Sequence, residues 1–586
     1  MKTIQTFLLI SAVAVFAVAA NAVELVKLAD ATPGRTGVCV TEMDGGERVE
    51  IPVTVLGTIG TGAPRGDIVL VRLDDSRFEK TGIIAGMSGS PVYLDGQLLG
   101  ALAFGWPFSK EPIGGVTPFE RMQKIEIQGS HPTGVGARPE FSTMLASASE
   151  GSLGGLLVDW LVPAGSDRLQ PLPLAVSAGG LGLPADGSWL AEGWRRMGWL
   201  ATPGSSGAPA VAAPDTEVFP GAMVASILVD GDATLAAGGT VTEIRGESLW
   251  AFGHPFLGSG ATLMPLARAH VVAVLPSLMS SFKFFTAGRP LGAVVADRKD
   301  GIVGRLGQEA PMVPVRVTVG GESYSFRAIR HPVLLPLLTA YLSQAGQNVE
   351  GRTFGDQTVR SRIEIRYPDF EPVVVTSTIS GAQAAGETSA MAAAVVAYLE
   401  NTSFDRPEVE AIDIRIDRFE EKEAAVILEV VPDRRIVSPG DDLNVRFRIQ
   451  PHRGAEVVYN LKVSIPLGLS DGRIDLVGAD GAAWTAYNLQ MRPLTPASFA
   501  DEVRLVNSLQ PSTVLVAALE RQDLGFAVAG GSLSAPPSIV LQLRSALGPN
   551  LETVSYAVFA KKQVDVPIAV AGAQRIQLTV RKGTQQ

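Results

Sequence analysis

The chain has 586 residues, of which 46% are hydrophobic and 18% charged, and its formal net charge is −10. This length exceeds what one core supports, so several domains are expected. The hydrophobic content excludes a disordered chain, and the acidic balance offers no basic surface for nucleic acid. The 63 glycines and 39 prolines indicate many turns and therefore a mainly β fold. Cys39 is the only cysteine, which excludes an intramolecular disulfide.

Residues 1–22 have the pattern of a secretory signal peptide. Lys2 precedes an apolar run at 7–18, and Ala-Asn-Ala at 20–22 is a cleavage motif. The apolar run is shorter than the about 20 residues of a membrane-spanning helix. We therefore expect an exported protein, periplasmic or extracellular, with no stable membrane span after cleavage. A retained N-terminal anchor is the alternative.

Residues 23–127 are expected to form a β unit around one turn. Period-two runs at 51–56 and 68–73 predict strands. The turn is Gly-Met-Ser-Gly-Ser-Pro at 86–91, where glycines on both sides of Ser88 allow positive φ angles. Such a turn presents the Ser88 hydroxyl as a nucleophile, with the N–H groups of Gly86 and Ser88 as oxyanion donors. Asp-Gly at 95–96, between two apolar runs, predicts a hairpin.

The next stretch brings a second β unit. Residues 119–122 predict a short helix, and 128–219 are expected to be a connector, with a glycine-interrupted helix over 145–161. Alternation resumes at 222–229, and two more strands lead to His254 at a strand end within a predicted unit at 220–330. Catalytic groups commonly occupy loops and strand ends on a rigid scaffold, which makes His254 the candidate base.

The remaining histidines are assigned structural positions, and two carboxylates compete to orient His254. The other four histidines are His131 in a loop, His270 in a strand, His331 at the border of a helix and His452 in a turn. Asp75 lies 13 positions before Ser88, and Asp297 lies 43 positions after His254. Either aspartate could instead be a turn residue or an arginine partner.

The C-terminal half predicts structural modules. Residues 331–407 are expected to be an α/β connector, with helices over 332–344 and 388–400. Short alternating strands from about 411 to 449 predict an immunoglobulin-like β-sandwich over 408–499. A further β-rich region is expected over 500–586.

Two segments resemble the SpoIVB-type serine peptidase family of the chymotrypsin-like clan. These are Thr-Gly-Ile-Ile-Ala-Gly-Met-Ser-Gly-Ser-Pro at 81–91 and Ala-Phe-Gly-His-Pro at 251–255. In that family histidine precedes serine, so the two halves stand here in rearranged order. The resemblance covers about 23–127 and 220–320.

The resemblance implies a chymotrypsin-like double β-barrel core in permuted order. Its catalytic residues would be Ser88, His254 and Asp75, with Asp297 as the alternate acid. The strand edge Ala103, Phe104 and Gly105 would bind substrate by β-addition.

We therefore expect an exported serine endopeptidase that cleaves protein or peptide substrates through a Ser/His/Asp acyl-enzyme mechanism. The sequence has no His-Glu-x-x-His, Cys-x-x-Cys or P-loop motif, so no metal and no cofactor is expected. The alternative is a catalytically inactive, peptidase-derived binding or scaffold protein of the cell envelope. The oligomeric state stays open.

Overall fold

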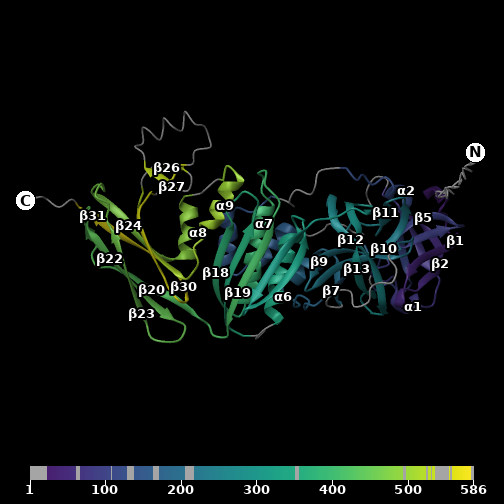
Figure 1. Cartoon of the computed structure of the whole chain (residues 1–586), viewed down its shortest axis with the longest axis horizontal. Coiled ribbons are helices and arrows are strands. Elements are labelled where there is room, and N and C mark those ends of the chain that lie inside the picture. Colours follow the sequence, from purple (N-terminus) through teal and green to yellow (C-terminus); the bar gives the residue numbers. More distant parts are fainter. Residues whose placement is uncertain are drawn as a thin grey trace, which may run out of the picture.

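The computed structural model describes residues 23–60, 66–106, 108–128, 137–162, 171–204, 217–349, 355–492, 496–522, 525–528, 531–534, 553–554 and 557–581. Strands account for 48% of the structure and helices for 19%, which confirms the expected mainly β fold. The molecule is elongated, with β1, β2 and β5 at one end and β22, β24 and β31 at the other (Figure 1). The proposed signal peptide at 1–22 and His131 lie outside the described residues.

Six antiparallel strands form a closed barrel in the order β1-β2-β3-β6-β5-β4. Period-two alternation produces it: in β2, every second residue from Val49 to Val55 is buried. Asp95 and Gly96 both have positive φ angles at the expected hairpin turn. The strands are β1 Thr36–Glu42, β2 Arg48–Ile59, β3 Ile68–Leu73, β4 Pro91–Leu94, β5 Gln97–Gly105 and β6 Ile113–Pro118. Short helices accompany them: η1 Leu28–Asp30, η2 Asp44–Gly46, α1 Phe78–Thr81 and α2 Phe119–Met122.

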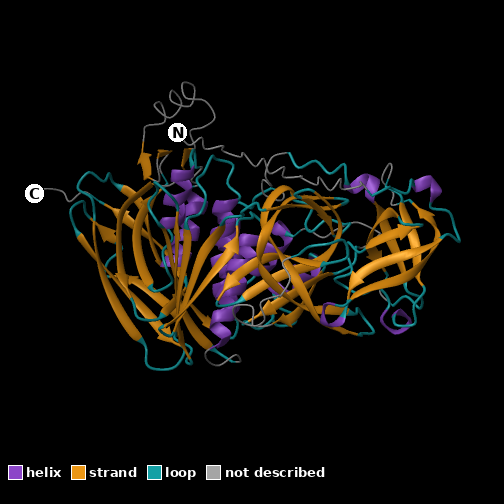
Figure 2. Cartoon of the chain, turned by 45° about the vertical axis from the view of Figure 1, so that its right-hand side comes forward, coloured by secondary structure: helices purple, strands orange, loops and turns teal. Residues whose placement is uncertain are grey.

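A second ring of six strands follows in the order β9-β12-β13-β14-β11-β10, and it closes because β10 also pairs with β9. The expected double-barrel core, with the serine barrel first, is therefore confirmed. The two barrels lie next to each other in Figure 2. The strands are β9 Met223–Gly231, β10 Thr234–Arg245, β11 Ser248–Ala251, β12 Gly260–Leu275, β13 Phe282–Arg298 and β14 Gly301–Leu306.

The region 128–219 is more than a connector, because two of its strands extend the second barrel. β7 pairs antiparallel with β10, and β8 pairs parallel with β7. The single helix expected over 145–161 is two helices, separated where Gly151 has a φ of 70°. The elements are α3 Phe141–Ser149, α4 Leu153–Leu161, β7 Leu174–Gly179, α5 Trp189–Arg196 and β8 Trp199–Gly204.

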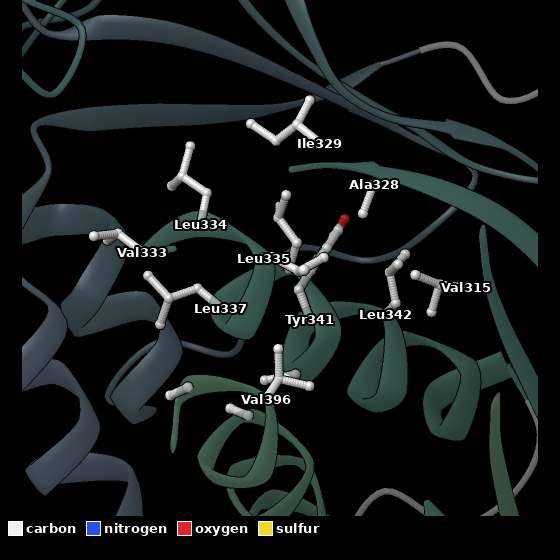
Figure 3. Close-up of a cluster of buried hydrophobic side chains, with 14 of the residues drawn as sticks. Val315, Ala328, Ile329, Val333, Leu334, Leu335, Leu337, Tyr341, Leu342 and Val396 are labelled. Carbon is white, nitrogen blue, oxygen red and sulfur yellow. The ribbon is translucent and has the colours of Figure 1, made fainter. Parts of the chain in front are cut away.

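A central α/β unit adjoins the second barrel through the β16–β9 pairing. Its strands run in the order β18-β17-β19-β15-β16. Apolar side chains of α6, including Leu335 and Leu342, pack between this sheet and Val396 of α7 (Figure 3). The elements are β15 Met312–Val319, β16 Glu322–Ile329, α6 Leu334–Val349, β17 Gln357–Arg366, β18 Val373–Gly381, α7 Ala384–Glu400 and β19 Ala411–Phe419.

The C-terminal part is one two-sheet sandwich over 424–580, which corrects the expected division into 408–499 and 500–586. One sheet runs β23-β22-β20-β30 and the other β21-β31-β24-β25-β29, so late strands complete sheets begun by early ones. β19, expected in the sandwich, instead pairs with β15 and β17. Alternation identified its buried face but not its partner. Pairing is decided by tertiary contacts between distant segments.

The elements of the C-terminal part are β20 Ala424–Pro432, β21 Ile436–Val437, β22 Asp442–Pro451, β23 Val457–Ser464, β24 Gly472–Asp480, α8 Gly481–Met491, α9 Phe499–Asn507, β25 Val514–Arg521, β29 Ala557–Asp565, β30 Ala569–Ala571 and β31 Ala573–Val580. A separate small sheet in the order β27-β26-β28 consists of β26 Gly525–Val528, β27 Gly531–Ser534 and β28 Thr553–Val554.

Gly89 tests how tightly the two barrels are joined. A Cβ atom at this position would lie 1.9 Å from the Thr240 carbonyl oxygen and 2.5 Å from the Phe252 nitrogen, and the φ of Gly89 is 98°. We expect Gly89→Ala to lower the free energy of unfolding of the barrel pair by at least about 2 kcal/mol, because strain adds to the clash. Thermal unfolding followed by circular dichroism measures it.

The matched control is Gly155→Ala within α4, where an added Cβ meets nothing within 4 Å. This change should be neutral or raise stability by up to about 1 kcal/mol, through helix propensity. Equal melting temperatures for the two variants would contradict close packing between the two barrels at Gly89.

Candidate active site

The turn that carries Ser88 has the expected shape. Gly86 and Gly89 have φ angles of 96° and 98°. Within the turn, Met87 N–H donates to the Ile84 carbonyl at 3.0 Å and Ser90 N–H to the Met87 carbonyl at 2.8 Å. The N–H groups of Gly86 and Ser88, the expected oxyanion donors, make no hydrogen bond to any described residue. Two donors of the turn are thus unpaired beside a buried hydroxyl.

The turn is fixed to the second barrel through β10. The N–H of Thr240 donates to the Ser88 carbonyl at 2.7 Å, and the Thr240 hydroxyl donates to the Gly86 carbonyl at 2.9 Å. The Thr242 hydroxyl donates to the Gly89 carbonyl at 2.7 Å. These bonds use the carbonyl side of the turn. Sequence reasoning missed both threonines, because nothing local marks which strand faces the turn.

His254 follows a strained backbone pair at the end of β11. Phe252 and Gly253 have left-handed φ angles of 70° and 71°, a conformation that is costly for phenylalanine and typical of functional sites. The Thr117 hydroxyl of the first barrel donates to the Gly253 carbonyl at 2.6 Å, so the bend is held from the opposite barrel.

The structure brings Ser88 and His254 together. His254 Nε2 lies 2.8 Å from Ser88 Oγ, and His254 Nδ1 lies 2.8 Å from the Pro255 carbonyl oxygen. A carbonyl only accepts, so Nδ1 carries the proton and Nε2 is free to accept from the Ser88 hydroxyl. This is the tautomer that a general base needs. The Pro255 carbonyl was not anticipated, although it belongs to the residue next to His254.

Burial keeps the imidazole neutral. His254 is 2% exposed, and burial lowers its pKa to about 4, against the opposing effect of the Pro255 hydrogen bond. A neutral imidazole is the form that accepts a proton, so His254 is in the basic form throughout the neutral range.

Asp297, the alternate acid, does not contact the imidazole. Its fully buried carboxylate accepts hydrogen bonds from the N–H groups of Phe256, Leu257 and Ser259 at 2.7, 2.8 and 3.0 Å. Burial raises the pKa of Asp297, although these donors act in the opposite direction. Asp297 therefore fixes the loop that directly follows His254 and Pro255. It is a positioning residue in this geometry.

His331 extends the same support to the central unit. Its Nδ1 accepts from the N–H groups of Val333 and Leu334, both at 3.2 Å, at the start of α6. Its Nε2 therefore carries the proton and donates to the Ser259 hydroxyl at 2.9 Å. The expected position at the border of a helix is confirmed. The link to Ser259 was missed, because the two residues are far apart in sequence.

The expectation that Asp75 orients His254 is wrong. Both oxygens of Asp75 bind the Arg77 guanidinium, the shortest contact being 2.6 Å, and the Arg77 N–H also donates to Asp75. This pair lowers the pKa of Asp75. Both ring nitrogens of His254 have other partners. An Asp-x-Arg turn satisfies its own carboxylate locally, and family position alone could not reveal this.

The expected substrate edge at Ala103, Phe104 and Gly105 lies on β5, and another part of the chain already pairs with it. Phe104 forms an antiparallel bridge with Pro171, and the Leu172 N–H donates to the Ala103 carbonyl at 2.9 Å. The edge is therefore already occupied by a segment of the same chain, and its role in substrate binding stays a prediction.

Cys39 is buried beneath the site. Burial raises the pKa of its thiol to about 12, so it is a protonated, inert side chain. The neighbouring Lys283 is fully buried, and burial lowers its pKa to about 7. Its Nζ donates to the Thr41 hydroxyl at 2.8 Å, and its alkyl chain packs against Gly86.

Comparison with protein-family models, with curated proteins and with solved structures finds no match to this chain. Among the residues that the structure describes, no group of three or more histidine, cysteine, aspartate or glutamate side chains is placed to hold a metal ion. No helix in those residues is both long and apolar enough to cross a membrane.

The buried histidines predict a specific acid sensitivity. Burial lowers the pKa of His254 and of His331 to about 4, whereas an unfolded histidine titrates near 6.5. Between these values the unfolded chain binds protons that the native chain does not. Stability therefore falls as the pH drops from about 6.5 toward 4, by up to about 3 kcal/mol per histidine.

Melting temperatures of the wild type and of His254→Gln between pH 7 and pH 4.5 measure this effect. We expect the variant to lose less stability than the wild type over that interval, because one of the two buried histidines with a lowered pKa is gone. Parallel pH profiles would contradict a depressed pKa at His254.

Proposed function

We propose that this protein is a serine endopeptidase of the chymotrypsin-like type, in line with the resemblance of its serine and histidine segments to the SpoIVB-type family. The observation that carries the proposal is the 2.8 Å contact between Ser88 Oγ and His254 Nε2 across two six-stranded barrels. A nucleophile within hydrogen-bond reach of a neutral base is the requirement for acyl transfer.

The geometry supports an ordinary acyl-enzyme cycle. Ser88 Oγ attacks the scissile carbonyl carbon while its proton passes to His254 Nε2. The developing oxyanion is received by the N–H groups of Gly86 and Ser88, which the turn leaves unpaired within the described chain. The C–N bond then breaks, and His254 gives its proton to the leaving amine. A water molecule, activated by the same histidine, hydrolyses the ester and restores Ser88.

The third member of this constellation is a main-chain carbonyl. The Pro255 oxygen selects the correct imidazole tautomer, but it carries no full negative charge to stabilise the imidazolium. In serine proteases the carboxylate supplies both effects. We therefore expect a slower enzyme than one with a complete triad. Asp297 contributes by holding the loop of residues 256–259, without touching the ring.

The proposal extends to location and substrate. The signal-like residues 1–22 favour export to the periplasm or the extracellular space. A strand edge next to a nucleophile suits an extended peptide, once the Pro171–Leu172 segment that pairs with it is displaced, so a protein or peptide is the proposed substrate.

One observation favours the competing function of an inactive scaffold. Ser88 is fully buried and His254 is 2% exposed, so the site needs an opening step before any substrate can react. A fluorophosphonate probe separates the two functions, since it reacts with an activated serine and not with an ordinary one.

The first functional test concerns the nucleophile. We expect the purified protein to form a covalent fluorophosphonate adduct on Ser88, located by peptide mass, and Ser88→Ala to lose it while keeping its far-UV circular dichroism. Ser90, buried in the same turn, is the matched control: Ser90→Ala should keep the labelling. An adduct that persists in Ser88→Ala would refute the assignment.

The second test separates the two aspartates. Asp297→Asn should lower kcat about 100-fold with little change in KM, because a small displacement of the loop misplaces His254. Asp75→Asn should change kcat less than about twofold, since a surface ion pair contributes about 0–1 kcal/mol. Peptide hydrolysis at neutral pH measures both. Loss of activity only in Asp75→Asn would overturn the loop-positioning role of Asp297.

A further inference from the structure

The strand edge beside Ser88 is paired with a segment of the protein's own chain, Pro171–Leu172. Phe104 and Pro171 form an antiparallel bridge, and the Leu172 N–H donates to the Ala103 carbonyl at 2.9 Å. These are the contacts that a peptide added to the β5 edge makes with its main chain. The expected substrate edge therefore has an internal occupant.

The side chain of Leu172 is seated on this edge. Leu172 is 5% exposed, yet it lies outside the hydrophobic clusters found among the described residues. A Cβ atom on Gly105 would lie 2.6 Å from Leu172 Cδ2 and 3.4 Å from Ile83 Cβ. The Leu172 side chain therefore occupies the space that a side chain at position 105 would fill, and the apolar Ile83 side chain lies next to Gly105. These apolar surroundings suit an aliphatic side chain and disfavour a charged one.

The segment is stiff and is anchored at its far end. Pro171 and Pro173 flank Leu172, and a residue before proline is restricted to extended conformations. The Leu174 N–H then donates to the Gly198 carbonyl at 2.9 Å, and Leu174 begins β7, which pairs with β10 of the second barrel. The segment therefore crosses from the edge of the first barrel to the second.

We propose that Pro171–Leu172 is an internal pseudosubstrate that occupies the peptide-binding edge of the Ser88 site. The inference rests on the proposed peptidase function and names its substrate class. That class is an extended peptide with proline followed by leucine, or another aliphatic residue, directly before the scissile bond.

Two observations explain why the segment is held without being cut. No hydrogen bond from the N–H groups of Gly86 or Ser88 reaches the Leu172 carbonyl within the described chain, so this carbonyl is outside the oxyanion site. The bond after Leu172 leads into Pro173, whose nitrogen lacks a proton and is tied into a ring. The segment therefore imitates only the part of a substrate that precedes the scissile bond.

A peptide that binds at the edge must displace this segment. Its apparent affinity is the intrinsic affinity reduced by the fraction of molecules whose edge is open. Ser88 is fully buried as well, so access to its hydroxyl also requires an opening step. The pairing of Pro171–Leu172 with β5 then controls both access to the edge and the preference for an aliphatic side chain.

The test measures binding without relying on turnover. Ser88→Ala is combined with Leu172→Asp, Leu172→Ala or Leu172→Met, and each full-length protein is titrated with fluorescein-Ala-Ala-Pro-Leu-amide by fluorescence anisotropy. We expect Leu172→Asp to lower the apparent Kd about tenfold or more, because the charge expels the segment and the open fraction rises. Leu172→Ala should have a smaller effect in the same direction.

Leu172→Met is the matched control, since it keeps an apolar side chain of similar size and should leave the Kd unchanged. The same peptide ending in Pro-Glu should bind weakly to every variant. Far-UV circular dichroism checks folding, and Leu172→Ala keeps the test valid if the aspartate variant unfolds. Equal Kd values for the Ala, Asp and Met variants would overturn the pseudosubstrate.

Fluorophosphonate labelling of the Ser88-containing proteins separates this inference from the proposed function. If no variant is labelled but the peptide Kd still falls in Leu172→Asp, the edge has its internal occupant and the peptidase proposal fails. If Ser88 is labelled in all variants at equal rates and the Kd is constant, the peptidase stands and the pseudosubstrate fails. Faster labelling of Leu172→Asp together with tighter binding supports both.

Discussion

The hydrogen bond from the Thr240 N–H to the Ser88 carbonyl is the contact on which the site depends. It joins the serine turn of one barrel to a strand of the other, and the threonine hydroxyls of β10 fix the same turn at two further carbonyls. β10 holds the turn through its carbonyl groups, so the N–H groups of Gly86 and Ser88 stay unpaired among the described residues. Glycine is required at position 89 because its backbone lies directly against Thr240 of β10, where no side chain fits.

The base is held from two directions. The first barrel secures the bend before His254 through Thr117, and Asp297 of the second barrel secures the loop after it. His331 continues this support to the start of α6, so the central α/β unit is bonded to the loop beside the site. These buried polar groups are all hydrogen-bonded, and any other position of the loop around His254 would leave one of them without a partner. They therefore hold the imidazole in one position. The chain order, with Ser88 before His254, has no effect on this result, because a site is defined by geometry.

The edge of β5 beside the candidate site is covered by another part of the chain. A strand edge with unpaired N–H and C=O groups binds any extended chain that reaches it, so proteins commonly cover such edges. Here the cover comes from the segment after α4, which continues into β7 and the second barrel. Pro171 and Leu172 are therefore part of the immediate surroundings of the candidate site. The distal sandwich has a separate core, formed by residues such as Phe447 and Leu515.

The sequence by itself determined the local features: the strands with period-two burial, the Asp95-Gly96 hairpin, the glycine-flanked turn at Ser88 and the strand end at His254. Each depends on neighbours in the chain, through backbone sterics and alternation. The tertiary structure alone decided which segments meet. It placed β19 in the central sheet, set His254 against Ser88, bonded the Ser88 turn to Thr240 of β10 and paired Leu172 with β5. Pairing of distant strands and polar groups depends on contacts between segments that local patterns do not specify.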